Sequence, residues 1–240
     1  MMASDLMLFQ VASIVALVGM GLGWRGVMTK YSGFYDLPTA WSMMFWGILL
    51  GGLYGNLGDA FLLLPTIEFG SPSVLNIVIC LMLAVSVHLI LRRKKVRITG
   101  SQPTTGWALG LSVGGMLGMF TIYRTLQINE FDLQVGATVV LIALTSPRSH
   151  ALIFSNHGYR MLLGQRWKAV ISTFFWCTIT ILSLYSAIFN PLIWIFVIPI
   201  LLLTENKAHD WVWAAIPKPA RRRLRRIWAD AARARNREEE

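Results

Sequence analysis

The 240-residue sequence predicts an all-α fold, a polytopic α-helical membrane protein with about seven transmembrane helices. Two observations favour this class. Hydrophobic residues make up 55% of the chain and charged residues only 14%, whereas a soluble domain carries roughly 25% charged residues. The apolar residues also gather in runs close to the ~20 residues that an α-helix needs to cross a bilayer core. Lipid is therefore the expected solvent for most of the chain.

Seven apolar runs follow one another along the chain. They cover residues 6–23, 39–64, 73–91, 106–126, 131–146, 169–187 and 190–204. The second run is long enough to tilt or to contain an unwound part, and the fifth and seventh are short. The last two runs are nearly continuous, so they form a tight hairpin, and the alternative is six spans plus a re-entrant hairpin. The chain divides into a transmembrane bundle over 1–204 and a basic tail over 205–240.

The basic residues predict how this bundle is oriented. Of the 22 Lys and Arg residues, 21 fall in every second loop or in the tail, and the alternate loops contain none. Because Lys and Arg favour the cytoplasmic side during insertion, we expect the N-terminus outside and the C-terminus in the cytoplasm. Six tryptophans lie at the same predicted inner boundary, where amphipathic rings are favoured: Trp24, Trp41, Trp107, Trp167, Trp211 and Trp213.

Two segments are expected to lie on the inner surface instead of crossing. The first begins with Ser146 as a helix N-cap and Pro147 at the first helical position, and Gly158 suits its end. The second is the tail, which we expect to form a basic amphipathic helix after Pro219. Its apolar residues follow one narrow stripe: Leu224, Ile227, Trp228 and Ala231.

Glycines recur every four residues in two of the runs. The second run carries Gly47, Gly51 and Gly55, and the fourth carries Gly106, Gly110, Gly114 and Gly118. Residues four apart share a helix face, so each run presents a smooth stripe that another backbone can approach closely. We expect both runs to pack tightly on other helices, and one possible arrangement is that the two runs face each other. A glycine-lined conduit is the alternative.

Asp59 is a charged residue inside the second apolar run, which makes it a candidate functional site. It follows Gly55 by four residues, and Arg124 follows Gly118 by six. Since the two runs point the same way, we expect both charges at a similar depth near the outer side, where they form an intramembrane ion pair. The alternatives are that each charge reaches the headgroups separately, or that Asp59 carries an ion or proton.

Two histidines lie in the expected surface helix. His150 and His157 are seven residues apart and share a helix face, close to Arg148, Asn156 and Arg160. This group could hold a phosphate, with His157 as base or nucleophile. Zinc sites need three or four protein ligands, and no Cys, Asp or Glu joins these histidines locally. We therefore expect neither a metal nor a cofactor.

Two basic patches mark the predicted cytoplasmic surface. They consist of Arg92, Arg93, Lys94, Lys95 and Arg97, and of Arg221, Arg222, Arg223, Arg225 and Arg226. Each such residue near an anionic leaflet contributes on the order of 1 kcal/mol, so anionic lipids at the inner surface are expected partners. An acidic protein could bind there as well. Nucleic acid is not indicated, because Trp228 is the single aromatic residue interleaved with the charges.

Function follows only in outline from these features. The sequence contains no phosphate-binding glycine loop, nucleophile elbow or paired carboxylates, so we do not expect catalysis. The interpretation that we favour is a subunit of a larger membrane assembly of the transport, secretion or conjugation type. Its partners would be other membrane proteins or copies of itself. A small-solute or ion transporter or channel is the alternative, and a membrane enzyme acting on lipid head groups comes third.

Overall fold

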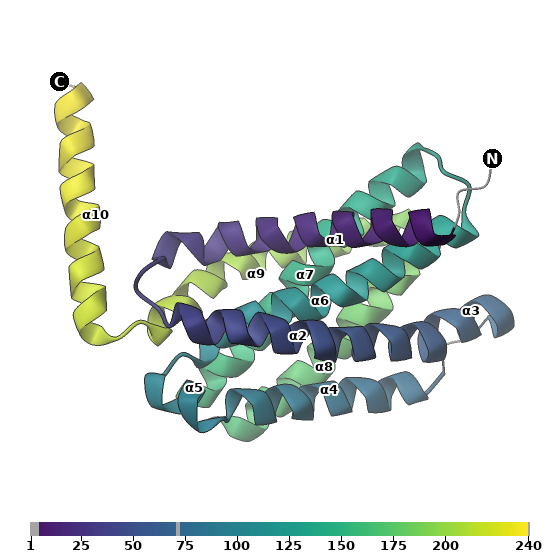
Figure 1. The fold of residues 1–240 in the computed structure, drawn as a ribbon, viewed down its shortest axis with the longest axis horizontal. Coiled ribbons are helices and arrows are strands. Elements are labelled where there is room, and N and C mark those ends of the chain that lie inside the picture. The colour runs from purple at the N-terminus through teal and green to yellow at the C-terminus, as the bar shows by residue number, and fades with distance from the viewer. Residues whose placement is uncertain (1–4, 71–72, 240) are drawn as a thin grey trace.

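The structure is a computed structural model that describes residues 5–70 and 73–239, with side chains as far as residue 235 (Figure 1). Its helices and helical turns are α1 (Asp5–Val27), η1 (Thr29–Tyr31), α2 (Leu37–Gly58), η2 (Asp59–Leu63), α3 (Leu64–Phe69), α4 (Leu75–Leu91), α5 (Lys94–Thr99), α6 (Gln102–Ile128), α7 (Leu133–Leu162), α8 (Arg166–Phe189), η3 (Pro191–Ile193), α9 (Trp194–Ala215) and α10 (Lys218–Glu239). Over the described residues, the predicted all-α class is confirmed.

Short polar residues and glycines set several helix ends. Asp36 caps α2 by accepting a hydrogen bond from the Thr39 amide at 3.2 Å, and Asp132 caps α7 in the same way through Val135 at 2.7 Å. These bonds satisfy amide groups that have no partner within the helix. Gly70 ends α3 in the left-handed conformation that glycine adopts without strain. The local sequence therefore decides where these helices begin and end.

Within residues 5–70 and 73–239, six helical segments are long and apolar enough to cross a membrane, which supports a multi-pass membrane protein. They are α1, Leu37–Phe69 (α2 to α3), α6, α7, α8 and Pro191–Ala215 (η3 with α9). The third predicted run forms α4, an apolar helix of 17 residues. At 1.5 Å per residue α4 is about 26 Å long, slightly less than the ~30 Å hydrocarbon core. It lies alongside α2 and α8 (Figure 1).

Helix α6 occupies the centre of the bundle, between α2, α1 and α7 (Figure 1). In its most apolar 18-residue stretch 89% of the residues are buried, against 17% in the segment that contains α9. Trp107, near the start of α6, is fully buried, so its ring packs among the helices instead of facing lipid headgroups. Its neighbours on α6 include glycines and alanines, which leave room for an indole between close helices.

The glycine stripe of α6 packs against the backbone of α7. A Cβ atom added at Gly110 would lie 2.6 Å from the Ala151 Cα, and one at Gly114 would lie 2.8 Å from the Pro147 Cα. Real Cβ atoms do not approach other atoms this closely. The two backbones therefore touch from Gly106 to Gly114, and Gly118 meets side chains of α7. The α7 chain fills the space in which a glycine-lined conduit would lie.

The glycines of α2 contact the other side of α6. Added Cβ atoms would lie 2.7 Å from the Leu109 carbonyl oxygen at Gly47, and 2.6 Å from the Val113 Cα at Gly51. The two glycine-rich runs are thus neighbours, but their stripes do not face each other, because the stripe of α6 is turned toward α7. Helical spacing shows which glycines share a face, yet not which neighbour that face will meet.

Helix α7 is continuous through Pro147, which overturns the prediction of a separate surface helix after residue 146. Proline cannot bond the carbonyl four residues before it, here that of Ala143. The backbone of α1 passes directly against this carbonyl at Gly19, and the Ser146 hydroxyl donates to the Gly114 carbonyl at 2.6 Å. Close packing on α1 and α6 therefore holds a proline inside the helix.

The helix that contains the last predicted apolar run is longer than that run. The boundary placed at residue 204 falls inside α9, which continues to Ala215, and the basic helix begins only at Lys218. In the sequence, polar residues such as Glu205 and Lys207 mark the end of the apolar run. In the structure the backbone stays helical there, because the opposite face of α9 packs on the bundle. Ala208 and Val212 on that face are fully buried.

Gly110→Ala should lower the free energy of unfolding by about 1–3 kcal/mol, because the added methyl group forces α6 and α7 apart. The measurement is an unfolding titration in detergent, followed by circular dichroism. Gly21→Ala is the matched control, since nothing lies within 4 Å of its added Cβ. Equal unfolding midpoints for the two variants would contradict the close contact.

Candidate functional site

Asp59 and Arg124 form a bidentate ion pair between the second and fourth predicted spans. Arg124 Nε donates to Asp59 Oδ1 at 2.9 Å, and Nη2 donates to Oδ2 at 2.8 Å. Asp59 is buried, and it is the first residue of the π-helical turn η2. Single π turns inside α-helices recur at functional sites, and here the turn lies at the pair itself.

The ion pair extends into a network that ties three helices together. Arg124 Nη1 donates to Gln127 Oε1 at 2.9 Å, and Gln127 Nε2 donates to Tyr123 Oη at 2.7 Å and to Asp5 Oδ1 at 3.2 Å. We call this part of the bundle the Asp59 end. Both carboxylate oxygens of Asp59 accept bonds from one guanidinium, an arrangement that suits helix registration better than proton transfer.

Asp59→Asn should cost about 3–5 kcal/mol of unfolding free energy, because it leaves Arg124 partly buried without a counter-charge. Adding Arg124→Gln should restore part of this loss in a double-mutant cycle measured in detergent. Asp230→Asn with Arg233→Gln is the control cycle, because that pair is exposed and separated by 3.8 Å. If the losses of unfolding free energy in the two single variants simply added up in the double variant, Asp59 and Arg124 would not be energetically coupled.

The predicted group of two histidines does not form one site. His157 is buried between α4 and α8, with its Nε2 3.1 Å from His88 Nδ1 and its Nδ1 2.7 Å from Thr173 Oγ1. His150 is fully buried on α7, where its Nδ1 lies 2.9 Å from the Ser146 carbonyl oxygen. The expectation that both histidines lie on the membrane surface is therefore wrong, because α7 continues into the bundle.

The phosphate-binding arrangement is likewise divided. Arg160 lies close to Asn156, to which its Nε donates at 3.3 Å, but His150 points elsewhere. The aliphatic part of Arg148 lies near Gly23 of α1, inside the bundle. Among the described residues no group of three or more His, Cys, Asp or Glu side chains could hold a metal ion. Arg148, His150 and Arg160 are therefore not shown to form one phosphate-binding group.

The opposite end of the bundle, which we call the basic end, carries the two predicted basic patches. Arg93 lies over the Trp46 ring at 4.7 Å, next to the short helix α5 that contains Lys94, Lys95 and Arg97. Helix α10 leaves the same end and runs across the direction of the long helices (Figure 1). Both patches are thus presented on one face of the molecule.

Aromatic contacts hold α10 at this angle. The Trp228 ring stacks on Trp213 of α9 with centroids 5.7 Å apart, and Lys30 lies 5.8 Å from the Trp228 centroid. Leu224 is buried against the bundle. Tyr31 lies beneath Trp228, and burial together with the charge of Asp210 raises the pKa of its phenol. The Tyr31 phenol therefore remains protonated and can donate a hydrogen bond to the backbone carbonyl oxygen of His209.

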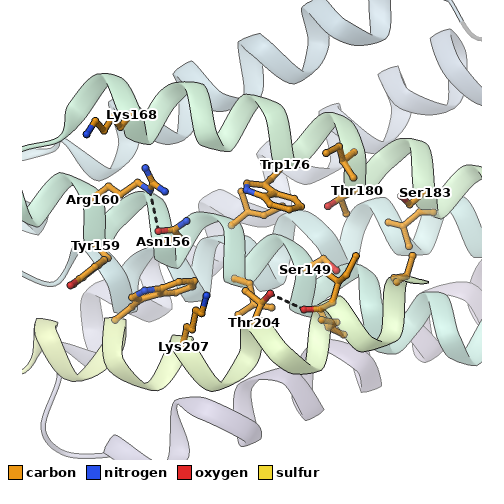
Figure 2. Close-up of a pocket in the computed structure, with 18 of the residues that line it drawn as sticks. Ser149, Asn156, Tyr159, Arg160, Lys168, Trp176, Thr180, Ser183, Thr204 and Lys207 are labelled. Carbon is orange, nitrogen blue, oxygen red and sulfur yellow. Dashed lines mark hydrogen bonds between the residues drawn. The ribbon is translucent and has the colours of Figure 1, made fainter. Parts of the chain in front are cut away.

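A groove of about 570 Å³ runs between α7, α8 and α9, and the sequence analysis missed it (Figure 2). Its cationic residues are Arg160, Lys168 and Lys207, and no carboxylate is among the residues that line it. Trp176 of α8 and Lys207 of α9 point into the space between the helices (Figure 2). The remaining lining is mostly apolar, with a few hydroxyl groups.

A sequence signal for this groove exists on α7. Ser149, Asn156 and Arg160 are spaced by seven and four residues, so they share one helix face. Once α7 is known to be a single helix, these three residues form one polar face that lines the groove. The assignment of these residues to a surface helix concealed the pattern.

Comparison of the chain with protein-family models, with curated proteins and with solved structures finds no match. The function must therefore be argued from the geometry of the two ends and of the groove.

Proposed function

We propose that this protein is a non-catalytic integral membrane subunit of a larger membrane assembly, and that it docks an acidic partner protein on its basic end. The observation that carries the proposal is the position of α10, a basic helix held across the end of the bundle by the contact between Trp213 and Trp228. A tail that served only to fix membrane orientation would not need a defined angle to the bundle.

The two faces of α10 have different chemistry. Leu224 is buried and Trp228 packs on the bundle, so this face is turned toward the membrane end. By helical spacing Arg222, Arg226 and Arg233 lie on the opposite face. Charges that point away from the bundle also point away from the lipid, and they suit an acidic protein surface better than lipid headgroups.

The alternative functions are less well supported. Two of the hydroxyl groups that could line a transport path bond to their own helices: Ser112 to Ala108 at 3.4 Å and Thr178 to Phe174 at 2.9 Å. An enzyme acting on headgroups would need a base close to its phosphate ligands, whereas His157 is occupied by His88 and Thr173. Nucleic-acid binding would use exposed aromatic rings, and Trp228 is engaged with Trp213.

The orientation is part of this proposal. If the basic end is cytoplasmic, Lys95→Cys should react with a membrane-impermeant maleimide only after the cells are opened. Glu130→Cys, at the Asp59 end, should react in intact cells. The native Cys80 and Cys177 are buried and serve as the unlabelled background. Labelling of Lys95→Cys in intact cells would reverse the topology and remove the cytoplasmic docking surface.

The docking proposal predicts a stoichiometric partner. The chain is extracted from its native membrane in mild detergent, its particle mass is measured and every co-purifying chain is identified. We expect one partner with an acidic surface, which is lost at high salt and in the variant Arg222→Glu/Arg226→Glu.

The matched control is Lys94→Glu/Lys95→Glu, which makes the same change of charge at the same end but outside α10. Retention of the partner in this control, together with its loss in the α10 variant, supports docking on α10. Equal loss of the partner in both variants would overturn the proposal. So would purification of the chain as a lone monomer or homo-oligomer, or with nucleic acid in place of a protein.

A further inference from the structure

We propose that the groove between α7, α8 and α9 binds one anionic membrane lipid, with its headgroup at the basic end and an acyl chain extending into the bundle. The site is independent of the docking surface, because it lies along the side of the bundle. Its volume of about 570 Å³ lies within the range of roughly 300–1,000 Å³ that is typical of small-molecule sites.

The architecture opens the groove toward lipid. Helices α8 and α9 follow each other in the chain, and both pack on α7, which forms the floor of the groove. The segment containing α9 is buried over only 17% of its most apolar stretch, and Phe196 and Leu203 of α9 are 70% and 72% exposed. A lipid in the surrounding bilayer can therefore enter from the side without crossing the protein.

The charge distribution selects the headgroup. Arg160, Lys168 and Lys207 come from three different helices and lie toward the same end of the groove (Figure 2), with no carboxylate among the lining residues to neutralise them. Asn156 accepts a hydrogen bond from Arg160 Nε at 3.3 Å and so orients its guanidinium. Three cations around a space of this size attract a phosphate-bearing headgroup and disfavour a zwitterionic one.

The apolar part of the groove suits an acyl chain. Trp176 points into the middle of the groove (Figure 2). Leu184, near the end of α8, and Val197, near the start of α9, also line the groove. Lys168 and Leu184 are sixteen residues apart on α8, or about 24 Å along the helix axis. A lipid with its headgroup among the cations therefore meets an apolar lining over the depth of one leaflet, roughly 15 Å.

The test is native mass spectrometry of the delipidated full-length protein in detergent, titrated with phosphatidylglycerol or with phosphatidylcholine of the same acyl chains. We expect phosphatidylglycerol to bind at one site at least about tenfold more tightly. Arg160→Gln/Lys207→Gln should remove this preference, whereas Arg222→Gln/Arg226→Gln, with the same loss of charge on α10, should leave it unchanged.

A second variant addresses the acyl chain. Thr180→Trp fills the apolar part of the groove without altering its charge, and it should weaken binding of both lipids even if the charge variant fails to fold. The proposal would be overturned if the two lipids bound with equal affinity. It would also be overturned if Arg160→Gln/Lys207→Gln kept the preference for phosphatidylglycerol, or if Thr180→Trp left lipid binding unchanged. Full displacement of the lipid by inorganic phosphate would show an anion site without a lipid.

Discussion

The backbone contact between α6 and its neighbours is the constraint on which the rest of this bundle depends. Gly106, Gly110 and Gly114 bring the backbone of α7 against one face of α6, and Gly51 of α2 brings a second backbone against another. In lipid, apolar side chains gain little by leaving the solvent, so such close approaches are a principal source of helix association. Helix α6 is therefore the axis around which the other helices are placed.

The central position of α6 explains both the proline inside α7 and the groove on the face of α7 that is turned away from α6. Because α7 is held along its whole length by α6, and by α1 at Gly19, it continues through Pro147. Its other face then remains available to α8 and α9, which pack on it from two sides and leave the groove between them. The groove is thus formed by helices that pack on α7, which α6 positions.

The two ends of the bundle differ in how they manage charge. At the Asp59 end, one acid and one base neutralise each other within the bundle, and Gln127 extends their network to α1. At the basic end, Arg and Lys side chains dominate, and helical spacing places Arg222 and Arg226 of α10 on the face opposite Leu224 and Trp228. A compensated pair fixes helix positions, whereas a surface with an excess of positive charge attracts an external counter-charge.

Local properties of the sequence were sufficient for part of this structure. Hydropathy marks the apolar helices, and the basic residues of alternate loops mark the basic end. The spacing of Asp59 and Arg124 from their glycines predicts that the two residues lie at the same level of the bundle. Each of these follows from composition or helical periodicity, which act within one segment.

Contacts between distant segments decided the rest. Pro147 signals a helix start on its own, and only the packing of α1 and α6 on α7 keeps it inside a helix. That continuity buries His150, exposes the face carrying Arg160 to the groove, and turns the α6 glycines toward α7. A sequence specifies the face of each helix, but the neighbour which that face meets depends on how all the helices pack together.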